Sequence, residues 1–374
     1  MIKPSGTLGI LGGGQLGRMI ALAARPLGYR VVVMDPSADC AAKPVVEEVI
    51  VGEFDDAGAA ARLAERADAV TIEIEKIGVG ALEAVSSRVP LRPSVSVLSM
   101  IRDRGKQKRW LENNGAPIGP WRLAEEPSAL HQALTELPGK CFVKSCTGGY
   151  DGRGQVETES AAEAERAWEL LGRSPVVVEQ GLELDYELSV LVARRPSGEV
   201  VTYAPARNHH ENRILAWSCW PGGIDGGVAA KAEEIARDLA AKMELEGVLA
   251  VEMFVTRGEE LFVNELAPRV HNSYHASERN AATSQFEQAV RAACDLPLGS
   301  PEPQGHAAIV NLLGEVWLKE GGARWDDALA VESSTLHLYG KSGPRPGRKM
   351  GHLSATGDSV EQAVQRAQEA FSKL

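Results

Sequence analysis

The sequence predicts an α/β and α+β protein of two or three domains. Its 374 residues exceed the size at which one hydrophobic core stops growing. A βαβ unit opens the chain, with a strand over 7–11, a helix to about residue 27 and a strand over 30–34. Strands and helices then alternate up to a link with glycine and proline at 114–120, so we expect the first domain to end near residue 110.

The composition sets limits on function and compartment. With 44% hydrophobic and 24% charged residues the chain is an ordinary soluble globular protein. Its formal net charge of -11 argues against a nucleic-acid partner, which requires a basic face. The five cysteines form no CxxC pair and predict neither a disulfide framework nor a zinc site. Because there is no leader pattern and no apolar stretch long enough to span a bilayer, we expect a cytoplasmic protein without membrane contact.

The first motif is a glycine turn after the opening strand. Gly12, Gly14 and Gly17 match GxGxxG, and Asp35 ends the second strand, a pattern typical of dinucleotide-binding folds. One interpretation is an NAD site. The other is that the turn packs a helix tightly against a strand and directs the helix N-terminus, with Gln15, at another phosphate or at no ligand. The motif alone does not decide between them.

The α/β pattern continues with a strand over 45–51, a helix over 57–67 and a strand over 69–75. Asp55 or Asp56 is placed to cap the helix. Glu73 and Glu75 are expected on one face of the third strand. Carboxylates at the C-terminal end of such a strand lie where ligands bind in open α/β sheets, although a solvated edge gives the same pattern.

A loop with four glycines follows a short strand that ends at Lys144. Glycines let the backbone aim several N–H groups at one anion, and Lys144 and Arg153 add two cations. Tyr150 and Asp151 supply a ring, a hydroxyl and an acceptor. The loop predicts phosphate binding, with a plain glycine hairpin as the alternative. Helices over 127–137 and 160–171 and a strand over 175–179 surround it, so this small α+β unit resembles a lid.

Two strands over 248–255 and 260–266 follow a long amphipathic helix over 225–245 and carry acidic residues in apolar surroundings. A buried, unpaired carboxylate costs several kcal/mol, so Glu252 needs a cation. Glu265 occupies a similar place in the next strand, and Asn264 adds an amide oxygen. If the strands are antiparallel neighbours, both carboxylates point at one site, and such oxygen ligands suit Mg²⁺ bridging phosphates. The alternative is a buried glutamate paired with arginine.

Two further polar segments lie near the C-terminus. Arg269, His271 and Asn272 follow the second acidic strand and are placed to contact a polar ligand. Residues 345–352 form a basic glycine turn. In an acidic protein, short cationic turns of this kind favour an anion site over a solvated hairpin.

These segments, taken in order, resemble those of the ATP-grasp enzymes and, within them, the 5-(carboxyamino)imidazole ribonucleotide synthetase family of purine biosynthesis. The matching segments are 12–18, 71–75, Lys144 with 148–154, 178–181, Glu187, Glu252, 264–273 and 345–352. The resemblance therefore covers nearly the whole chain. It implies an ATP-grasp fold with a Rossmann-like domain over 1–110, an ATP-grasp region over 111–300 with a lid at about 121–182, and a small C-terminal domain over 301–374.

The resemblance also implies an activity. The expected enzyme is an ATP-dependent ligase that carboxylates 5-aminoimidazole ribonucleotide with bicarbonate and gives the N5-carboxy product, ADP and phosphate through carboxyphosphate. It implies ATP and Mg²⁺ as cofactors, with Mn²⁺ as the alternative metal, and a homodimer.

Residue roles follow from the resemblance by motif. It assigns ATP contacts to Arg104, Lys144, Gly148, Gly149, Tyr150, Asp151, Gly152, Arg153, Gly154, Glu179, Gln180, Glu187, His210, Asn264 and Glu265. It assigns the metal to Glu252 and Glu265. It assigns catalysis to Tyr150, Asp151, Arg153, Arg269, His271 and Lys349. It assigns the aminoimidazole nucleotide to Gln15, Glu73, Asn272, Ser273, Arg345, Arg348 and Lys349.

The chain departs from the family pattern at a few positions. Tyr274 stands where the family usually has glycine, which is expected to narrow or reshape the imidazole pocket. Arg213 also replaces a glycine, and Ile72, Ile74 and Lys76 replace Tyr, Phe and Asn. Other hypotheses are a different ATP-grasp carboxylase or ligase, an NAD-dependent dehydrogenase, and a nucleotide-binding regulatory protein without turnover. The segments at 269–273 and 345–349 favour the aminoimidazole branch.

Overall fold

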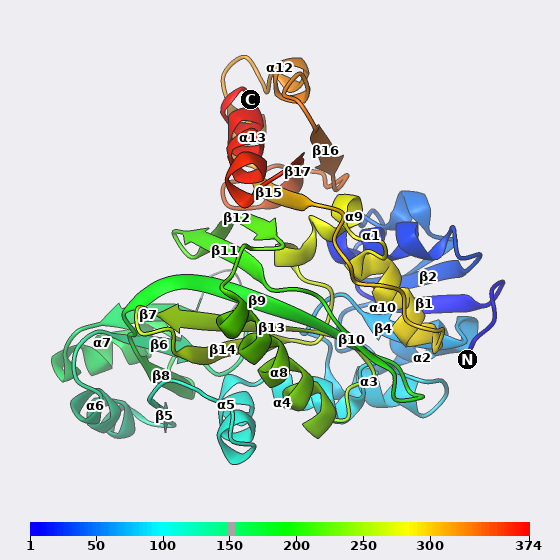
Figure 1. Cartoon of the computed structure of the whole chain (residues 1–374). Helices are drawn as coiled ribbons and strands as arrows, with labels where there is room; N and C mark the ends of the chain where they lie inside the picture. The colour runs from blue at the N-terminus through cyan, green and yellow to red at the C-terminus, as the bar shows by residue number, and fades with distance from the viewer. Residues whose placement is uncertain (149–153) are drawn as a thin grey trace.

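A computed structural model describes residues 1–148 and 154–374 as three β-sheets with helices packed against them (Figure 1). The first sheet, blue in the figure, belongs to the N-terminal unit. The second lies in the lid, and the third runs through the middle and the C-terminal end of the chain. The α/β and α+β character predicted from the sequence is confirmed.

The N-terminal unit is a parallel α/β layer. It contains β1 (Thr7–Leu11), α1 (Gln15–Ala24), β2 (Arg30–Asp35), η1 (Lys43–Val45), β3 (Glu48–Val51), α2 (Ala57–Arg66), β4 (Ala69–Ile72), α3 (Val79–Ser86), α4 (Val95–Ile101) and α5 (Arg104–Asn113). Its strands lie in the order β3-β2-β1-β4, and every pairing is parallel. Asp56 caps α2 by accepting hydrogen bonds from Gly58 N and Ala59 N. The βαβ opening and the cap are therefore confirmed.

One strand ends earlier than the sequence predicts. β4 stops at Ile72, so Glu73 and Glu75 lie in the segment that follows it. The expectation that both carboxylates share one strand face is wrong, because the alternation of faces ends with the strand. The Glu73 carboxylate accepts hydrogen bonds from the backbone of the first glycine turn, whereas Glu75 forms an ion pair with Arg269.

The lid is a small unit with its own core. It contains β5 (Trp121–Ala124), α6 (Pro127–Glu136), β6 (Cys141–Ser145), β7 (Gln155–Thr158), η2 (Ala161–Glu163), α7 (Ala164–Leu170) and β8 (Val176–Gln180). The strands lie in the order β5-β8-β6-β7 with antiparallel pairings. Leu130, Val143 and Trp168 are among its buried residues. Because these contacts are local, the lid packs as one body.

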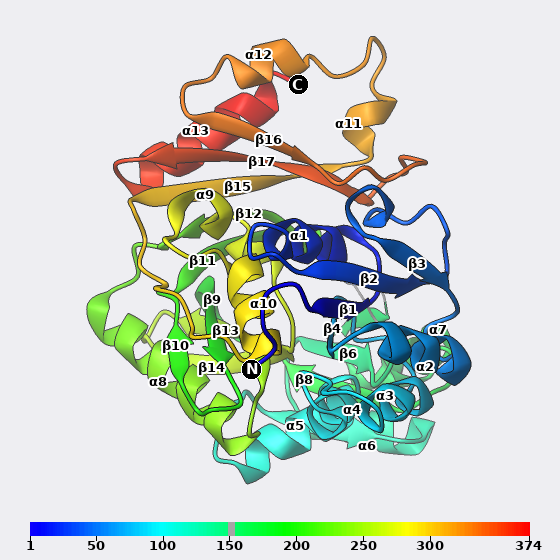
Figure 2. The same cartoon turned by 90° about the vertical axis from the view of Figure 1, so that its right-hand side faces the viewer.

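The third sheet joins the rest of the chain. Its elements are β9 (Leu184–Arg194), β10 (Val200–Thr202), β11 (Ala206–Glu211), β12 (Ile214–Trp220), α8 (Gly226–Lys242), β13 (Gly247–Thr256), β14 (Leu261–Ala267), η3 (Asn272–Tyr274), α9 (Ser277–Asn280), α10 (Gln285–Cys294), β15 (His306–Leu313), α11 (Glu315–Leu318), α12 (Trp325–Leu329), β16 (Ser334–Leu338), β17 (Lys349–Gly357) and α13 (Val360–Ser372). The order is β14-β13-β9-β11-β12-β15-β17-β16, and β10 pairs with β9. Figure 2 shows β15, β16 and β17 running alongside one another beneath α13.

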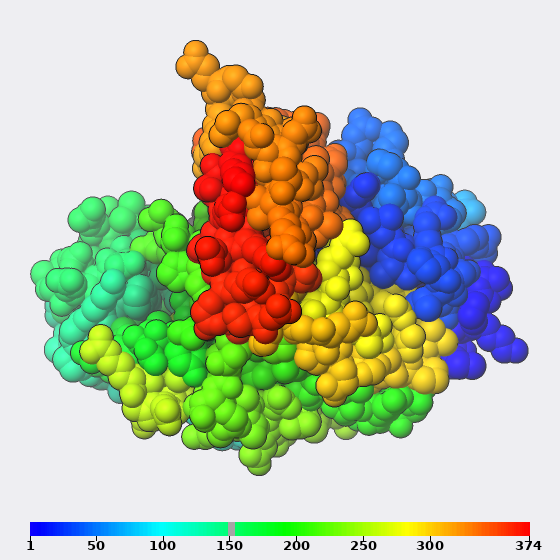
Figure 3. All heavy atoms as spheres, turned by 45° about the horizontal axis from the view of Figure 1, so that its top comes forward, coloured from blue at the N-terminus to red at the C-terminus, as the bar shows by residue number. Residues whose placement is uncertain are grey.

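The C-terminal segment is therefore continuous with the central sheet. Trp217 to Trp220 of β12 pair with Ala307 to Val310 of β15, and the backbone ladder continues into β17. In Figure 3 this segment, orange to red, stands between the lid and the N-terminal unit. Strand β17 of this segment begins at Lys349. The strand pairing therefore fixes the position of the Lys349 backbone.

The N-terminal unit is locked to the central sheet by a shared core. Residues of α1, among them Met19 and Ile20, are buried in one cluster with Phe286 and Val290 of α10. Burial of this kind stabilises by roughly 25 cal/mol per Å² of apolar surface. Within the described residues, none of the helices combines the length and the apolar character needed to cross a bilayer.

An aromatic group fills the centre of this core. Tyr274 is fully buried, and its ring lies 5.9 Å from that of Tyr203 and 6.3 Å from that of Trp220. Its hydroxyl lies 2.7 Å from Ser189 O and 2.9 Å from Ala204 O. The side chain thus points between β9 and the segment that precedes β11.

We expect Tyr274→Phe to lower the free energy of unfolding by about 1 kcal/mol, because it removes one buried hydrogen bond and keeps the ring. Tyr274→Ala removes the ring as well and should cost about 3–5 kcal/mol. Urea denaturation of both variants beside the parent measures the difference. Equal losses in the two variants would contradict a ring that carries most of the stabilisation.

Candidate active site

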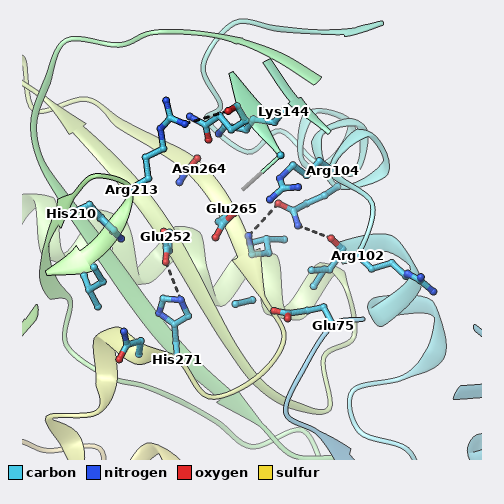
Figure 4. Close-up of a pocket in the computed structure, with 18 of the residues that line it drawn as sticks. Glu75, Arg102, Arg104, Lys144, His210, Arg213, Glu252, Asn264, Glu265 and His271 are labelled. Atoms are coloured by element: carbon cyan, nitrogen blue, oxygen red, sulfur yellow. Dashed lines mark hydrogen bonds and ion pairs between the residues drawn. The ribbon is translucent and has the colours of Figure 1, made fainter. Parts of the chain in front are cut away.

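A cleft of about 740 Å³ lies where the three sheets meet (Figure 4). Side chains reach it from α1 and α5, from the lid strands β6 and β8, and from β13, β14 and β17. Small-molecule sites usually occupy roughly 300–1,000 Å³. The cleft is therefore large enough for a nucleotide and a second small substrate.

Two carboxylates face this cleft from adjacent strands. Glu252 of β13 and Glu265 of β14 are direct partners in the antiparallel ladder. The register then shifts, so that Met253 pairs with Val263 and Asn264 has no partner in the ladder. This β-bulge lets Asn264 and Glu265, although consecutive, both line the cleft. The sequence prediction that the two carboxylates share one site is confirmed.

The electrostatics of this pair fit a cation. Burial raises the pKa of Glu265, and the neighbouring Glu252 carboxylate raises it further. Burial alone would also raise the pKa of Glu252, but the His271 ring outweighs it and lowers the pKa to about 2. Asn264 Oδ1 is buried and has no hydrogen-bond partner among the described residues. A divalent cation would allow both carboxylates to ionise and would use this amide oxygen.

A buried chain of hydrogen bonds holds His271 against Glu252. His271 Nε2 lies 3.0 Å from Glu252 Oε1, and His271 Nδ1 lies 2.8 Å from Ser273 Oγ. Ser189 Oγ donates to Ser273 Oγ at 2.7 Å, and Asn208 Nδ2 donates to Ser189 Oγ at 3.1 Å. Because the amide nitrogen only donates, the hydroxyl protons point towards His271 Nδ1. This direction assigns the ring proton to Nε2, which donates to Glu252.

Positive charges face the carboxylates from the other side of the cleft. Lys144 Nζ lies 2.7 Å from Glu179 Oε2, and Lys108 Nζ lies 3.2 Å from Glu179 Oε1. Burial raises the pKa of Glu179, but the two ammonium groups outweigh it and lower the pKa to about 2. Figure 4 shows Arg104 on the same side of the cleft as Lys144, and Arg104 Nη1 donates to Ser145 O at 2.9 Å.

A second acid–base pair borders the cleft near the lid. His210 Nδ1 lies 2.7 Å from Glu187 Oε2. Burial lowers the pKa of His210, yet the Glu187 carboxylate outweighs it, so the pKa is raised overall. Both side chains line the cleft, as expected of nucleotide-contacting residues.

The end of the cleft next to the N-terminal unit carries groups suited to a polar substrate. Arg269 Nε lies 2.8 Å from Glu75 Oε1, which fixes the guanidinium. Asn272 is buried, and neither its side-chain nitrogen nor its oxygen has a hydrogen-bond partner among the described residues. Gln15 and Lys349 complete this end. Buried amides are normally satisfied, so Asn272 is placed to hydrogen-bond a polar group in the cleft.

Most residues assigned from the sequence converge on this cleft. Those that line it are Gln15, Arg104, Lys144, Gly148, Gly154, Glu179, Gln180, Glu187, His210, Glu252, Asn264, Glu265, Arg269, His271, Asn272 and Lys349. The assigned residues Gly149, Tyr150, Asp151, Gly152 and Arg153 lie outside the described residues, so their roles stay predictions.

Four assigned residues do not line the cleft. Ser273 is fully buried behind His271. Arg348 Nη1 donates to Gly343 O at 2.9 Å, and Arg345 is exposed in the same turn before β17. Glu73 lies under the first glycine turn. Their contact with a substrate stays a prediction.

The NAD interpretation of the glycine turn is wrong for a physical reason. Gly14 N donates to Glu73 Oε1 at 2.6 Å, and Gly17 N donates to Glu73 Oε2 at 2.8 Å. Gly13 N donates to Asp35 Oδ2 at 2.9 Å. The donors that would hold a pyrophosphate are thus used by two carboxylates, which would repel it. The turn packs α1 against β1, and this leaves Gln15 at the cleft.

The expectation for Tyr274 is also wrong. Its side chain lies in the core and does not line the cleft, so it does not narrow the pocket. Arg213 is accommodated differently, with a φ of 67° in the left-handed region that favours glycine. Its Nη2 lies 2.9 Å from Glu157 Oε1 of β7, so it joins the turn between β11 and β12 to the lid.

Sequence reasoning missed two lysines. Lys108 follows Arg104 by one helical turn on α5, and that spacing within the basic segment was the available signal. Lys341 hydrogen-bonds Gln15 Oε1 and donates to Lys349 O at 2.9 Å. No local pattern marks Lys341, because its partners are distant in the chain.

We expect Glu179→Gln to destabilise the fold most at neutral pH. The folded-state pKa of about 2 lies below the ordinary 4.5, so ionised Glu179 stabilises the fold above pH 4.5, and this is lost as the pH falls towards 2. Urea midpoints measured between about pH 6 and pH 3 should therefore converge for the variant and the parent. Glu165→Gln, on the exposed face of α7, is the control. A gap that does not change with pH would contradict the ion-pair explanation.

Comparison with known proteins agrees with this geometry. Residues 109–286 match the ATP-grasp domain, residues 5–102 the ribonucleotide synthetase preATP-grasp domain, and residues 307–366 the phosphoribosylaminoimidazole carboxylase C-terminal domain. The N5-carboxyaminoimidazole ribonucleotide synthase of Bacillus subtilis (strain 168) is 39% identical over 95% of this chain and 92% of its own length.

Solved structures are similar over almost the whole chain. N5-carboxyaminoimidazole ribonucleotide synthetase from Thermus thermophilus is 38% identical, with a TM-score of 0.90 and 98% of both chains covered. N5-carboxyaminoimidazole synthase from Aspergillus clavatus, in complex with ADP and 5-aminoimidazole ribonucleotide, is 31% identical, with a TM-score of 0.90 and 98% of both chains covered. With this fold, this cleft and these relatives, the chain belongs to the N5-carboxyaminoimidazole ribonucleotide synthase family of ATP-grasp enzymes.

Proposed function

We propose that this protein is an ATP-dependent carbon–nitrogen ligase of purine biosynthesis. It carboxylates 5-aminoimidazole ribonucleotide with bicarbonate and gives N5-carboxyaminoimidazole ribonucleotide, ADP and phosphate. The observation that carries the proposal is the arrangement across the cleft, where Lys144 of the lid faces Glu252 and Glu265 of the central sheet. The identity of at least 30% to synthases of this reaction over nearly the whole chain supports it.

The acidic pair would hold the metal. Glu252 and Glu265, with Asn264 Oδ1, form the oxygen donor set that Mg²⁺ prefers, and Mn²⁺ is the alternative. The unsatisfied amide oxygen and the raised pKa of Glu265 support this assignment. When bound, the ion neutralises charge on the phosphates of ATP.

The nucleotide would lie between the lid and the central sheet. Phe142, Leu184 and Phe254 give this part of the cleft an apolar lining that suits a base. Glu179, Gln180, Glu187 and His210 border it and would contact the nucleotide. Arg104, Lys144 and the glycine loop over 148–154 would bind the phosphates and close over them. Closure would keep water from the reactive intermediate.

The second substrate would occupy the end of the cleft formed by Gln15, Arg269, His271, Asn272 and Lys349. Bicarbonate is a weak electrophile. Transfer of the γ-phosphoryl group to a bicarbonate oxygen gives carboxyphosphate and ADP. The amine nitrogen then forms the new bond to carbon, phosphate leaves, and the amine loses a proton. Arg269 and Lys349 would neutralise the oxygens of the intermediate, so catalysis rests on positioning and charge.

Two further groups of residues complete the proposal. Tyr150, Asp151 and Arg153 of the glycine loop would face carboxyphosphate or the imidazole substrate. The aminoimidazole nucleotide would be contacted or supported from around the cleft by Glu73, Ser273, Arg345 and Arg348. The family resemblance supports the assignment of these last four residues, none of which lines the cleft.

The assembly and the compartment are also proposals. The family resemblance supports a homodimer through the N-terminal unit. A cytoplasmic location is supported by the five cysteines, all buried and unpaired.

An assay of ADP release separates this function from other ATP-grasp reactions. We expect release to require both bicarbonate and 5-aminoimidazole ribonucleotide for full rate. ADP release with no dependence on the imidazole nucleotide would refute the proposed substrate and leave only an ATPase.

We expect Glu265→Gln to lower turnover by at least about 100-fold, because an amide cannot supply the charge that the metal and the phosphates need. The fold should survive, since glutamine keeps the shape of the side chain in the cleft. Circular dichroism and ADP release measure the two effects. Near-normal turnover in this variant would contradict the metal assignment.

Lys349→Ala should raise KM for the imidazole nucleotide, or lower kcat, by about 10–100-fold and leave KM for ATP nearly unchanged. The reason is that Lys341 links the backbone of Lys349 to Gln15, at the end of the cleft next to the N-terminal unit. Initial rates with each substrate varied in turn give the comparison, and Lys349→Arg, which keeps the charge, is the matched control. A change confined to ATP would place Lys349 at the other substrate.

A further inference from the structure

A group of metal-ligating side chains lies outside the cleft, between α9 and the C-terminal strands. Glu278 comes from α9, His337 from β16 and His352 from β17. Their ligand atoms all lie within 4.8 Å of one another. None of the three lines the catalytic cleft.

The fold brings these three residues together by strand pairing. His337 and His352 are direct partners in the antiparallel ladder of β16 and β17, so their side chains project from one face. Their rings lie 5.1 Å apart and nearly parallel. Glu278 approaches the two rings from helix α9, and its Oε2 lies 3.2 Å from His337 Nδ1. The arrangement thus combines two segments fixed by one ladder and a third from a separate helix.

A hydrogen bond fixes the orientation of the His352 ring. Tyr339 Oη lies 2.9 Å from His352 Nδ1. A partner on one ring nitrogen orients the ring and leaves the other nitrogen to the metal, as in many metal centres.

The spacing matches a tetrahedral ion after a small adjustment. Bonds of about 2.0–2.2 Å place tetrahedral ligands about 3.4 Å apart. The 3.2 Å between Glu278 and His337 is close to this value. The ligand atoms all lie within 4.8 Å of one another, and rotation of the exposed Glu278 side chain can move its carboxylate towards the two rings. The exposure of Glu278 also gives an ion an entry path and a water as fourth ligand.

We propose that Glu278, His337 and His352 form a Zn²⁺ site that ties α9 to the C-terminal strands. Two imidazoles and one carboxylate are a donor set typical of zinc and unsuited to Mg²⁺, which prefers oxygen ligands. Because β17 begins at Lys349, an ion here would stabilise the strand that carries a cleft residue. The site is distinct from the oxygen-rich pair Glu252 and Glu265.

Competition titration tests the proposal. The chelator-treated full-length protein is titrated with ZnCl₂ against a chromophoric zinc indicator, and MgCl₂ is titrated in parallel. We expect one zinc equivalent whose affinity falls by at least about tenfold in Glu278→Gln and in His337→Ala. Zinc should also raise the Tm of the parent more than that of either variant, because binding to the folded state stabilises it.

A matched control tests whether zinc binding needs the three-residue group or only a histidine beside a glutamate. His209 Nε2 lies 3.4 Å from Glu211 Oε1 and is half exposed, and neither residue belongs to a three-ligand group among the described residues. His209→Ala should bind zinc as the parent does. A zinc-edge anomalous difference map should place the ion between Glu278 and His352. Zinc affinity unchanged in both site variants, or an anomalous peak only in the cleft, would overturn the proposal.

Discussion

Two carboxylates that face one buried point cannot both ionise unless a cation lies between them. Glu252 and Glu265 meet this constraint because they are partners in the ladder of β13 and β14. The bulge at Asn264 adds an amide oxygen that has no hydrogen-bond partner among the described residues. His271 Nε2 donates to Glu252, and a chain of buried hydroxyls that ends at Asn208 holds the ring in place. This arrangement supports the proposed metal site in the cleft.

The surrounding units bring further polar side chains to the cleft that contains this acidic pair. The lid carries Lys144, whose ammonium group is fixed by Glu179, and the same carboxylate fixes Lys108 of the N-terminal unit. The core shared by α1 and α10 holds the N-terminal unit against the central sheet, which brings Gln15 to the cleft. The ladder from β12 through β15 to β17 brings Lys349. Residues more than 300 positions apart in the sequence therefore meet at one cleft.

Several sequence predictions depended only on local pattern, and these are confirmed. The βαβ opening, the Asp56 cap, the amphipathic helix that became α8 and the acidic pair all follow from periodicity or from a carboxylate in an apolar run. Where the outcome depended on an unseen partner, the pattern was insufficient. The glycine turn has the dinucleotide pattern, yet Glu73 and Asp35 occupy its donors. Tyr274 follows cleft residues, yet a turn of η3 sends it into the core.

The sequence by itself determined the residue types of the site and their order, because motif spacing and a buried carboxylate's need for a cation are local properties. It also determined the family, since the motifs lie along nearly the whole chain. Only the tertiary structure decided which of these residues share the cleft, that Lys108 and Lys341 belong to its surroundings, and that Glu278 meets two histidines of the C-terminal strands. The physical reason is that hydrogen bonds and ion pairs form between segments whose contact depends on strand order and shared cores.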